Sequence, residues 1–262
     1  MKINTIESPK NNLVKKINTL ATTKGRKNSE EFLVEGNKFV LSIPKSWEVT
    51  NTVFSETYAE NNLGEVQKAI NPIIFKDSIF NTASDTMTPA GVMAVVKMRK
   101  FSLNDILACP KKFIVIACNL QDPGNMGTII RTANAAGASG IVVSKDSADI
   151  FSPKVVRSAA GSLFNLPIAV MDVEVAAKEL KANGVQLVAT DLSTDLSPYQ
   201  TDFTRPLALM IGNESRGLSD EMLALADVKV RLPMSEQVES LNASVASGVL
   251  MYEVVRQRGM ER

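Results

Sequence analysis

Histidine is absent from this 262-residue sequence, and cysteine is scarce. The lack of imidazole excludes the commonest general base, serine–histidine–aspartate catalysis and most zinc sites. We therefore expect no bound metal. The two cysteines, Cys109 and Cys118, lie in apolar surroundings without metal-ligand spacing, so we interpret both as reduced packing residues in a reducing compartment.

Long apolar runs and a strong net charge are also missing. The start, MKINTIESPKNNLVKK, lacks the apolar core of a signal peptide, and no run approaches the roughly 20 residues needed to cross a bilayer. We expect a cytoplasmic protein without a membrane partner. The net charge is only +1, so a nucleic-acid partner would have to bind a local basic patch.

One basic segment is present near the start of the chain. It contains six cations and no acidic residue: Lys10, Lys15, Lys16, Lys24, Arg26 and Lys27. Leu13, Val14, Ile17 and Leu20 follow helical spacing, which predicts an amphipathic helix that ends near Gly25. The lysines on its opposite face either are simply solvated or contact phosphate groups.

The alternation of apolar runs and helical patterns predicts two α/β domains. Residues 32–100 form a small α/β domain, and residues 113–257 repeat strand and helix more strictly. Buried strands alternating with helices predict a mostly parallel sheet with helices on both faces. The charged and polar stretch 99–112 is the candidate hinge, which divides the chain into domains 1–105 and 106–262.

Three segments of the second domain carry polar residues at strand ends, where open α/β sheets bind ligands. The first is Asp122–Ala133, DPGNMGTIIRTA, which follows a strand and opens a helix. Its two glycines allow close backbone approach, Asn125 is placed to cap the helix, and Arg131 lies on one face of that helix. By itself, the pattern also fits a capped helix with a surface arginine.

The second segment is Leu209–Leu218, LMIGNESRGL, a strand that enters a glycine turn before a helix that Ser219 caps. Gly212 would let a ligand lie against the main chain. Glu214 and Arg216 either orient a polar substrate or form a local surface ion pair.

The third segment, residues 228–247, joins a strand, a loop and a helix rich in small residues. Ser240 or Asn242 is a candidate helix cap. Met234 and Leu241 either wall an apolar pocket or belong to the core.

Together, in this order and at these separations, the three segments resemble the signature motifs of the SpoU (TrmH) family of RNA 2′-O-ribose methyltransferases. The resemblance covers roughly residues 111–258. The N-terminal part, with Asn11–Lys15, Phe32–Gly36 and Thr88–Lys97, is similar to the small ribosomal-protein-like substrate domain that many members carry.

The resemblance implies a fold, a cofactor and a partner. The fold would be that of the SPOUT superfamily, with a deep trefoil knot that departs from the rule against threaded loops. S-adenosylmethionine would be held in a bent shape, largely by main-chain groups, and members form a homodimer through this domain. The positions that match the cofactor-binding residues are Thr190, Leu192, Gly212, Leu232, Met234 and Leu241.

The resemblance also implies catalytic residues. The positions that match are Asn125, Arg131, Glu214, Ser240 and Asn242, with the central role usually given to Arg131. A guanidinium is a permanent cation without an acceptor, which makes it an awkward general base. Our hypothesis is that Arg131 holds an RNA phosphate and stabilises the developing alkoxide. The basic segment would contact RNA phosphates through Lys15, Lys16, Arg26 and Lys27.

Three other functions compete with methyl transfer to ribosomal RNA. A transfer-RNA ribose methyltransferase is one, although the N-terminal domain favours ribosomal RNA of the large subunit. A non-catalytic RNA-binding or ribosome-assembly protein with the same fold is another, but the polar residues of the motifs are intact. A nucleotide-dependent oxidoreductase is disfavoured because no G-x-G-x-x-G follows the relevant strands.

Overall fold

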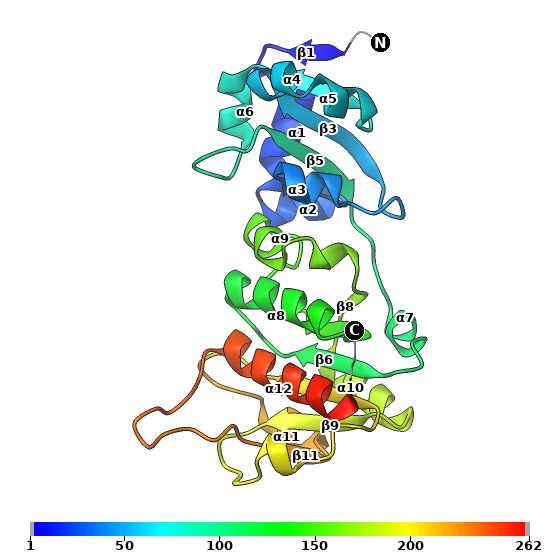
Figure 1. The fold of residues 1–262 in the computed structure, drawn as a ribbon, viewed down its shortest axis with the longest axis vertical. Coiled ribbons are helices and arrows are strands. Elements are labelled where there is room, and N and C mark those ends of the chain that lie inside the picture. Colours follow the sequence, from blue (N-terminus) through cyan, green and yellow to red (C-terminus); the bar gives the residue numbers. More distant parts are fainter. Residues whose placement is uncertain (1–2, 260–262) are drawn as a thin grey trace. The chain divides into compact units, whose positions relative to one another are not determined.

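A computed structural model describes residues 3–259, which fold into two compact units (Figure 1). Unit 1 contains the residues up to Arg99 together with Asp149–Phe164, and unit 2 contains Lys100–Ala148 and the residues from Asn165 onward. Within residues 3–259, no helix is both long and apolar enough to span a membrane. The same residues contain no group of three or more acidic or cysteine side chains that could hold a metal ion.

Unit 1 is built on a mixed sheet with the strand order β1-β4-β3-β5-β2. β1, β4 and β3 are parallel, whereas β5 pairs antiparallel with β3 and β2. Its strands are β1 (Asn4–Ile6), β2 (Glu31–Glu35), β3 (Val49–Ser55), β4 (Pro72–Phe75) and β5 (Val92–Lys97). Its helices are α1 (Asn12–Leu20), α2 (Thr23–Ser29), α3 (Asn37–Leu41), α4 (Glu56–Asn61), α5 (Leu63–Lys68), α6 (Asp77–Ala83), α9 (Pro153–Ala159) and the 3-10 turn η1 (Ser162–Phe164).

The basic segment of unit 1 forms two helices, where the sequence predicted one. Asn11 caps α1 by accepting from the backbone N–H of Leu13, and Thr22 caps α2 by accepting from Gly25. The buried face of α1, with Val14, Ile17 and Leu20, packs on the sheet as its spacing predicted. Gly25 therefore lies inside a second helix and does not end the first.

Unit 1 also contains residues 149–164, which the sequence assigned to the second domain. The Phe151 ring packs on Phe32 of β2 with centroids 4.8 Å apart, and the Trp47 ring meets Phe164 edge to face at 5.2 Å. The Trp47 indole N–H also donates to the carbonyl oxygen of Phe164 at 3.1 Å. This segment thus contributes to the aromatic core of unit 1.

Unit 2 contains a fully parallel sheet with the strand order β11-β9-β10-β6-β7-β8. The mostly parallel α/β sheet predicted from the sequence is confirmed. Its strands are β6 (Phe113–Ala117), β7 (Gly140–Ser144), β8 (Ile168–Met171), β9 (Gln186–Thr190), β10 (Leu207–Ile211) and β11 (Val228–Val230). Its helices are α7 (Leu103–Leu107), α8 (Pro123–Ala135), α10 (Val173–Ala182), α11 (Asp220–Leu225), α12 (Ala243–Arg258) and the 3-10 turn η2 (Pro198–Gln200).

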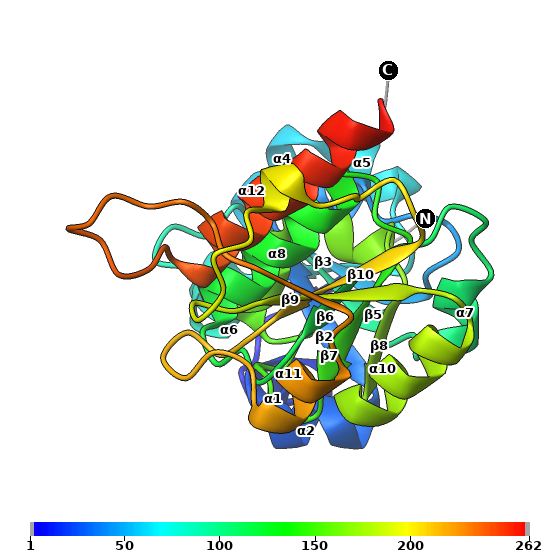
Figure 2. The same cartoon turned by 90° about the horizontal axis from the view of Figure 1, so that it is seen from below.

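Helices cover both faces of the unit 2 sheet. α8 and α12 lie side by side on one face, and α10 and α11 lie on the other (Figure 2). The buried residues of α7, α10 and α11 form one apolar cluster with side chains from the strands. The sheet is therefore buried on both faces, which explains why its strands read as continuous apolar runs. The trefoil knot remains a prediction.

The candidate hinge at residues 99–112 contains the helix α7. Ser102 and Asp105 form a reciprocal capping box at its start, and Leu103 and Ile106 are buried in the apolar cluster of unit 2. The chain passes from unit 1 to unit 2 at Arg99–Lys100. Most of this stretch thus folds as part of unit 2, and the division of the chain at residues 105 and 106 remains a prediction.

Candidate cofactor pocket and catalytic residues

A cavity of about 430 Å³ lies at the carboxyl ends of β9, β10 and β11, three strands adjacent in the sheet. Its walls come from the loops that follow these strands and from the start of α12. A parallel sheet brings all its carboxyl ends to one edge, so loops far apart in sequence meet there. The volume falls in the range of about 300–1,000 Å³ that is typical of small-molecule sites.

All six residues predicted to bind the cofactor line this cavity: Thr190, Leu192, Gly212, Leu232, Met234 and Leu241. Leu192 is 58% exposed and Leu241 is 41% exposed, which leaves apolar surface for a ligand to cover. Their role in cofactor binding remains a prediction, but the structure brings them to one place.

Gly212 begins the loop after β10, and the loop closes tightly around it. A Cβ atom at Gly212 would overlap the carbonyl carbon of Gly217 and the amide nitrogen of Leu218. Asn213 and Gly217 exchange two backbone hydrogen bonds of 2.9 Å, which fasten the loop at its base. Only glycine therefore permits this close approach of main chain to main chain.

Glu214, on the same loop, joins the second motif to the first. Its carboxylate accepts the side-chain amide of Asn125 at 3.2 Å. It also accepts the backbone N–H groups of Gln121 at 3.2 Å and Asp122 at 3.1 Å. The pairing of β10 with β6 explains this meeting, because each loop follows one of these two neighbouring strands.

These contacts determine the charge state of Glu214. Partial burial raises the pKa of the carboxyl. Hydrogen bonds from its own backbone N–H, from Asn125 and from the main chain of Gln121 and Asp122 lower the pKa, and together they outweigh the effect of burial. The net pKa lies below the ordinary value, so Glu214 is ionised at neutral pH. A carboxylate in this state is a weak base, and its hydrogen bonds suit it to hold Asn125 in place.

Ser240 and Asn242 stand at the junction between the third loop and α12. Ser240 lines the cavity. The Asn242 side chain caps α12, since its Oδ1 atom accepts the backbone N–H of Ser244 at 2.9 Å and of Val245 at 3.4 Å. The predicted cap is thus confirmed for Asn242, and the same contacts fix the side chain at this end of α12.

The first motif differs in one respect from its predicted geometry. Asp122, and not Asn125, caps α8, since it accepts the backbone N–H of Asn125 at 2.7 Å. Asn125 is buried inside the first turn, which frees its side chain to reach Glu214. The proline in DPGN is the signal for this earlier start, because proline favours the first helical position.

Arg131 lies on the exposed side of α8. Within residues 3–259, no hydrogen bond or ion pair joins it to Asn125, Glu214, Ser240 or Asn242. The structure thus brings Asn125 and Glu214 into contact and places Ser240 at the same cavity. It leaves Arg131 as an exposed cation on the helix that carries Asn125.

Asn213 and Gln121 shape the site but were not singled out in the sequence. The Asn213 Oδ1 atom accepts from the N–H groups of Ser215 and Arg216, and its Nδ2 donates to the carbonyl of Asn119 at 2.8 Å. Asparagine beside a glycine turn is typical of such side-chain-to-backbone turns, which was an available signal. The contacts of Gln121 depend on tertiary structure, and no local pattern predicts them.

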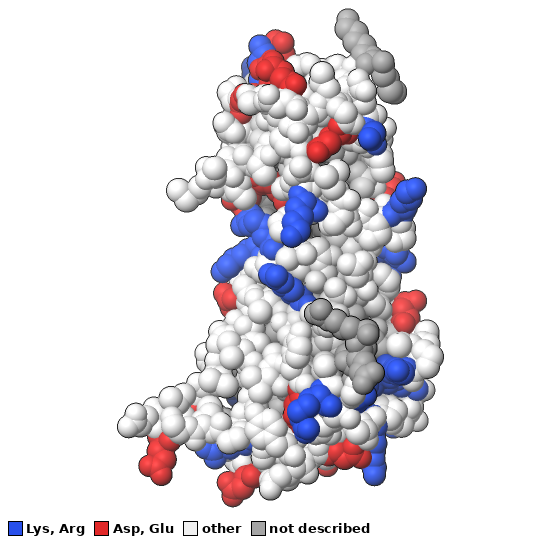
Figure 3. Space-filling model, in the orientation of Figure 1, with Lys and Arg blue, Asp and Glu red and all other residues white. Residues whose placement is uncertain are grey.

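The four predicted RNA-binding cations of unit 1 differ in their availability. Lys15 and Lys27 are exposed, whereas Lys16 forms an ion pair with Glu31 at 2.5 Å. Arg26 is only 2% exposed and pairs with Asp149, so the structure removes it from the set that a phosphate could reach. Figure 3 shows basic and acidic side chains scattered among uncharged ones on one face of the molecule.

Two family models match this chain. The model described as the SpoU rRNA Methylase family matches residues 112–252, and the MRM3-like substrate binding domain matches residues 11–94. The first covers every residue of the cavity and of the three motifs. The second covers the basic segment almost completely.

Similar proteins extend over nearly the whole chain. The 23S rRNA (guanosine(2553)-2′-O)-methyltransferase RlmP of Bacillus subtilis is 35% identical over 95% of this chain and 98% of its own length. The 23S rRNA (uridine(2479)-2′-O)-methyltransferase of Streptomyces viridochromogenes is 36% identical over 89% of this chain and 85% of its own. The AdoMet-bound rRNA methyltransferase of Sinorhizobium meliloti is 32% identical, with a TM-score of 0.87 over 97% of this chain and 98% of its own. The chain therefore belongs to the SpoU rRNA methylase family.

Proposed function

We propose that this protein transfers a methyl group from S-adenosylmethionine to a ribose 2′-hydroxyl of ribosomal RNA, in the large subunit. The observation that carries the proposal is the cavity at the ends of β9, β10 and β11, beside which Glu214 holds Asn125. Similar proteins named as 23S rRNA 2′-O-methyltransferases support the ribose and the large subunit as targets.

The cavity fits S-adenosylmethionine in volume and chemistry. Apolar side chains such as Leu192, Met234 and Leu241 would cover the adenine and the carbon skeleton, while main chain around Gly212 would lie close to polar edges. When bound, the cofactor supplies a methyl group activated on a sulfonium. The protein must then position the ribose oxygen and stabilise its charge.

The residues of the first two motifs would do this work on the RNA side. Arg131 is an exposed cation, suited to hold a phosphate and stabilise the developing alkoxide by charge. The Asn125 amide, held by Glu214, would orient the ribose. The 2′-hydroxyl proton would leave late, to water or to a neighbouring group, since a guanidinium has no acceptor.

The substrate would be held in part by unit 1. Lys15 on α1 and Lys27 on α2 are exposed and are suited to phosphate contact. The match of residues 11–94 to a substrate binding domain supports this role. We place the reaction in the cytoplasm, with ribosomal RNA as the partner.

A homodimer through unit 2 is part of the proposal. Val245 is 52% exposed and Tyr252 is 53% exposed, and they lie seven residues apart on α12, hence on one face of that helix. Exposed apolar side chains on one helix face favour burial against a second copy. Light scattering should give twice the chain mass, and Tyr252→Glu should shift it toward the monomer.

The experiment that tests the function compares three RNAs. Purified protein and isotope-labelled S-adenosylmethionine are incubated with unmodified large-subunit RNA, small-subunit RNA and transfer RNA. We expect incorporation into large-subunit RNA. Incorporation into transfer RNA alone would identify a transfer-RNA methyltransferase instead. No incorporation into any of the three RNAs would favour a non-catalytic RNA-binding protein.

A further inference from the structure

The peptide bond between Ala148 and Asp149 marks the point where the chain leaves unit 2 for unit 1. The residues on its two sides are held by separate sets of hydrogen bonds. Those on the unit 2 side connect to the loop that leads into α8, the helix of Asn125, and through it to Glu214. Those on the unit 1 side connect to the basic helices.

On the unit 2 side, the loop after β7 is bonded to the loop after β6. The backbone N–H groups of Asn119 and Leu120 donate to the hydroxyls of Ser144 at 2.8 Å and Ser147 at 3.1 Å. The Ala148 N–H donates to the carbonyl of Leu120 at 2.7 Å. Asn119 has a φ of +54°, in the left-handed region that asparagine adopts more readily than most residues with a side chain, and these bonds hold the loop in that conformation.

The loop after β6 continues directly into the first motif. The side chain of Gln121 donates to the carbonyl of Asp146 at 2.6 Å, while its backbone N–H donates to Glu214. The Asn119 carbonyl accepts from Asn213 of the second motif. The position of residues 144–148 is therefore linked by hydrogen bonds to both Gln121 and Glu214.

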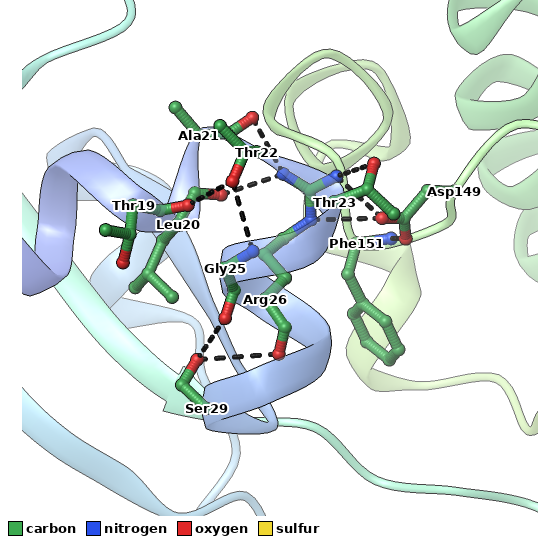
Figure 4. A network of polar contacts seen from close by, with 10 residues as sticks. All are labelled: Thr19, Leu20, Ala21, Thr22, Thr23, Gly25, Arg26, Ser29, Asp149 and Phe151. Atoms are coloured by element: carbon green, nitrogen blue, oxygen red, sulfur yellow. Dashed lines mark hydrogen bonds and ion pairs between the residues drawn. The ribbon is translucent and has the colours of Figure 1, made fainter.

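On the unit 1 side, the buried Arg26 holds Asp149 (Figure 4). Its Nε and Nη2 atoms donate to one carboxylate oxygen of Asp149 at 3.0 and 2.6 Å. Its Nη1 atom donates to the carbonyls of Leu20 and Ala21, at the end of α1. The other Asp149 oxygen accepts the Phe151 N–H at 2.9 Å. A charge pair with this many fixed partners specifies one geometry.

We propose that Asp149 is a positioning residue for the methyl-transfer site, acting through the loop 144–148 on Gln121, Asn125 and Glu214. This inference rests on the proposed function. Arg26 lies on the same helix as the exposed Lys27, so RNA bound to α2 acts on the helix that fixes Asp149. Engagement of the substrate by unit 1 thereby stabilises the active arrangement of the two motif loops.

A merely structural role would give a different result. In that case the Arg26–Asp149 pair only fastens residues 149–164 to unit 1, and its loss would change stability or RNA affinity. A positioning role changes the turnover number while the dissociation constants for RNA and cofactor stay near their original values. The two roles are therefore separable by measurement.

The test replaces Asp149 with asparagine and uses Asp85→Asn as its matched control. Asp85 pairs with Arg157 of the same segment at 2.8 Å, but neither of these two side chains is buried, in contrast to Arg26. We expect Asp149→Asn to lower kcat by roughly tenfold, a typical size for coupling between contacting residues, with little change in either dissociation constant. Asp85→Asn should behave like the unchanged protein.

A second variant, Ser147→Ala, interrupts the same path from within unit 2. It should lower kcat to a similar extent, and the double variant should be little worse than either single one, because one path cannot be interrupted twice. Hydrogen exchange of the peptide that contains Asn119 and Leu120 should accelerate in Asp149→Asn but not in Asp85→Asn. If Asp149→Asn fails to fold, Ser147→Ala alone must show the loss of kcat.

Three results would overturn the inference. They are an unchanged kcat and exchange rate in Asp149→Asn, an effect on RNA affinity alone, and additive effects in the double variant. Failure of the proposed function is distinguishable, since the unchanged protein would then methylate none of the RNAs. The exchange measurement still decides in that case, because it needs neither RNA nor cofactor.

Discussion

The cavity end of unit 2 and the basic segment of unit 1 differ in what determines the role of each polar side chain. At the cavity, turns set by Gly212 and Asn213 bring main-chain groups and Glu214 to fixed positions. In the basic segment, helices α1 and α2 carry cations whose roles depend on burial, from the exposed Lys15 to the buried Arg26. Local turns thus define the loops of the first region, which tertiary contacts of Glu214 then join, whereas in the second region tertiary contacts alone decide which cations stay exposed.

The largest effect is expected from Arg131, an exposed arginine that contrasts with the buried Arg26. Arg131→Ala should lower kcat by about 100- to 1,000-fold, the usual loss when one group that stabilises developing charge is removed. Cofactor binding should persist, because Arg131 does not line the cavity.

The pH–rate profile of Arg131→Lys tests how this residue acts. If charge and placement are its contribution, lysine restores part of the rate and leaves the pH dependence unchanged. Full restoration with a shifted pH dependence would instead support a role as general base.

The next largest effect concerns the main chain of the cavity. Gly212→Val should weaken S-adenosylmethionine binding by about 100-fold or more, since the new side chain would overlap Gly217 and displace the loop. Calorimetric titration with cofactor measures this. Gly64→Ala is the control, because a Cβ there meets no atom within 4 Å; equal binding by both variants would contradict a cavity built from main chain.

Arg26→Ala should reduce stability more than it reduces any direct RNA contact. It removes the guanidinium that donates to Asp149 and to the carbonyls of Leu20 and Ala21. Because Asp149 is partly exposed and keeps the Phe151 N–H, the expected cost is about 2 kcal/mol, below that of a fully buried pair. Urea denaturation measures the loss in unfolding free energy. If the variant keeps its stability but binds RNA more weakly, Arg26 contacts RNA directly and the structural role is contradicted.

The exposed lysines should affect RNA binding and leave the stability of the fold almost unchanged. Replacing both Lys15 and Lys27 with alanine should weaken RNA binding by about tenfold. The slope of the logarithm of the binding constant against the logarithm of the salt concentration should become shallower by roughly 0.7–0.9 for each phosphate contact that is lost. Stability should stay within about 0.5 kcal/mol. Lys45→Ala, at an exposed position between α3 and β3, is the control, and an unchanged salt slope in the double variant would contradict phosphate contact.

The smallest effect concerns the pH dependence of stability at Glu214. Because its pKa is lowered in the folded state, its stabilising contribution is present above the unfolded value of about 4.3 and is lost as pH falls through the folded value. Glu214→Gln should therefore be slightly less stable than the original protein at pH 7, and the gap should close in acid. Urea midpoints at several pH values measure it, with the exposed Glu236→Gln as control; a gap that widens in acid would contradict the hydrogen-bond account.

The sequence predicted the cavity better than the basic segment for a physical reason. Strand ends, glycine turns and the helix cap Asn242 are local features, and a parallel sheet brings them to one edge whatever the details of packing. The burial of Arg26 depends on Asp149, which lies 123 residues away, and no local pattern reports such a partner. The same is true of residues 149–164, whose aromatic side chains pack in unit 1.

The most direct test of the account is the chemical position of the transferred methyl group. Labelled large-subunit RNA is hydrolysed in alkali, where a 2′-O-methyl group protects the adjacent phosphodiester because the 2′-oxygen cannot attack it. We expect the label in alkali-resistant dinucleotides from unchanged protein and its absence with Arg131→Ala. Label in mononucleotides, on a base, would contradict the claim that this site acts on a ribose hydroxyl.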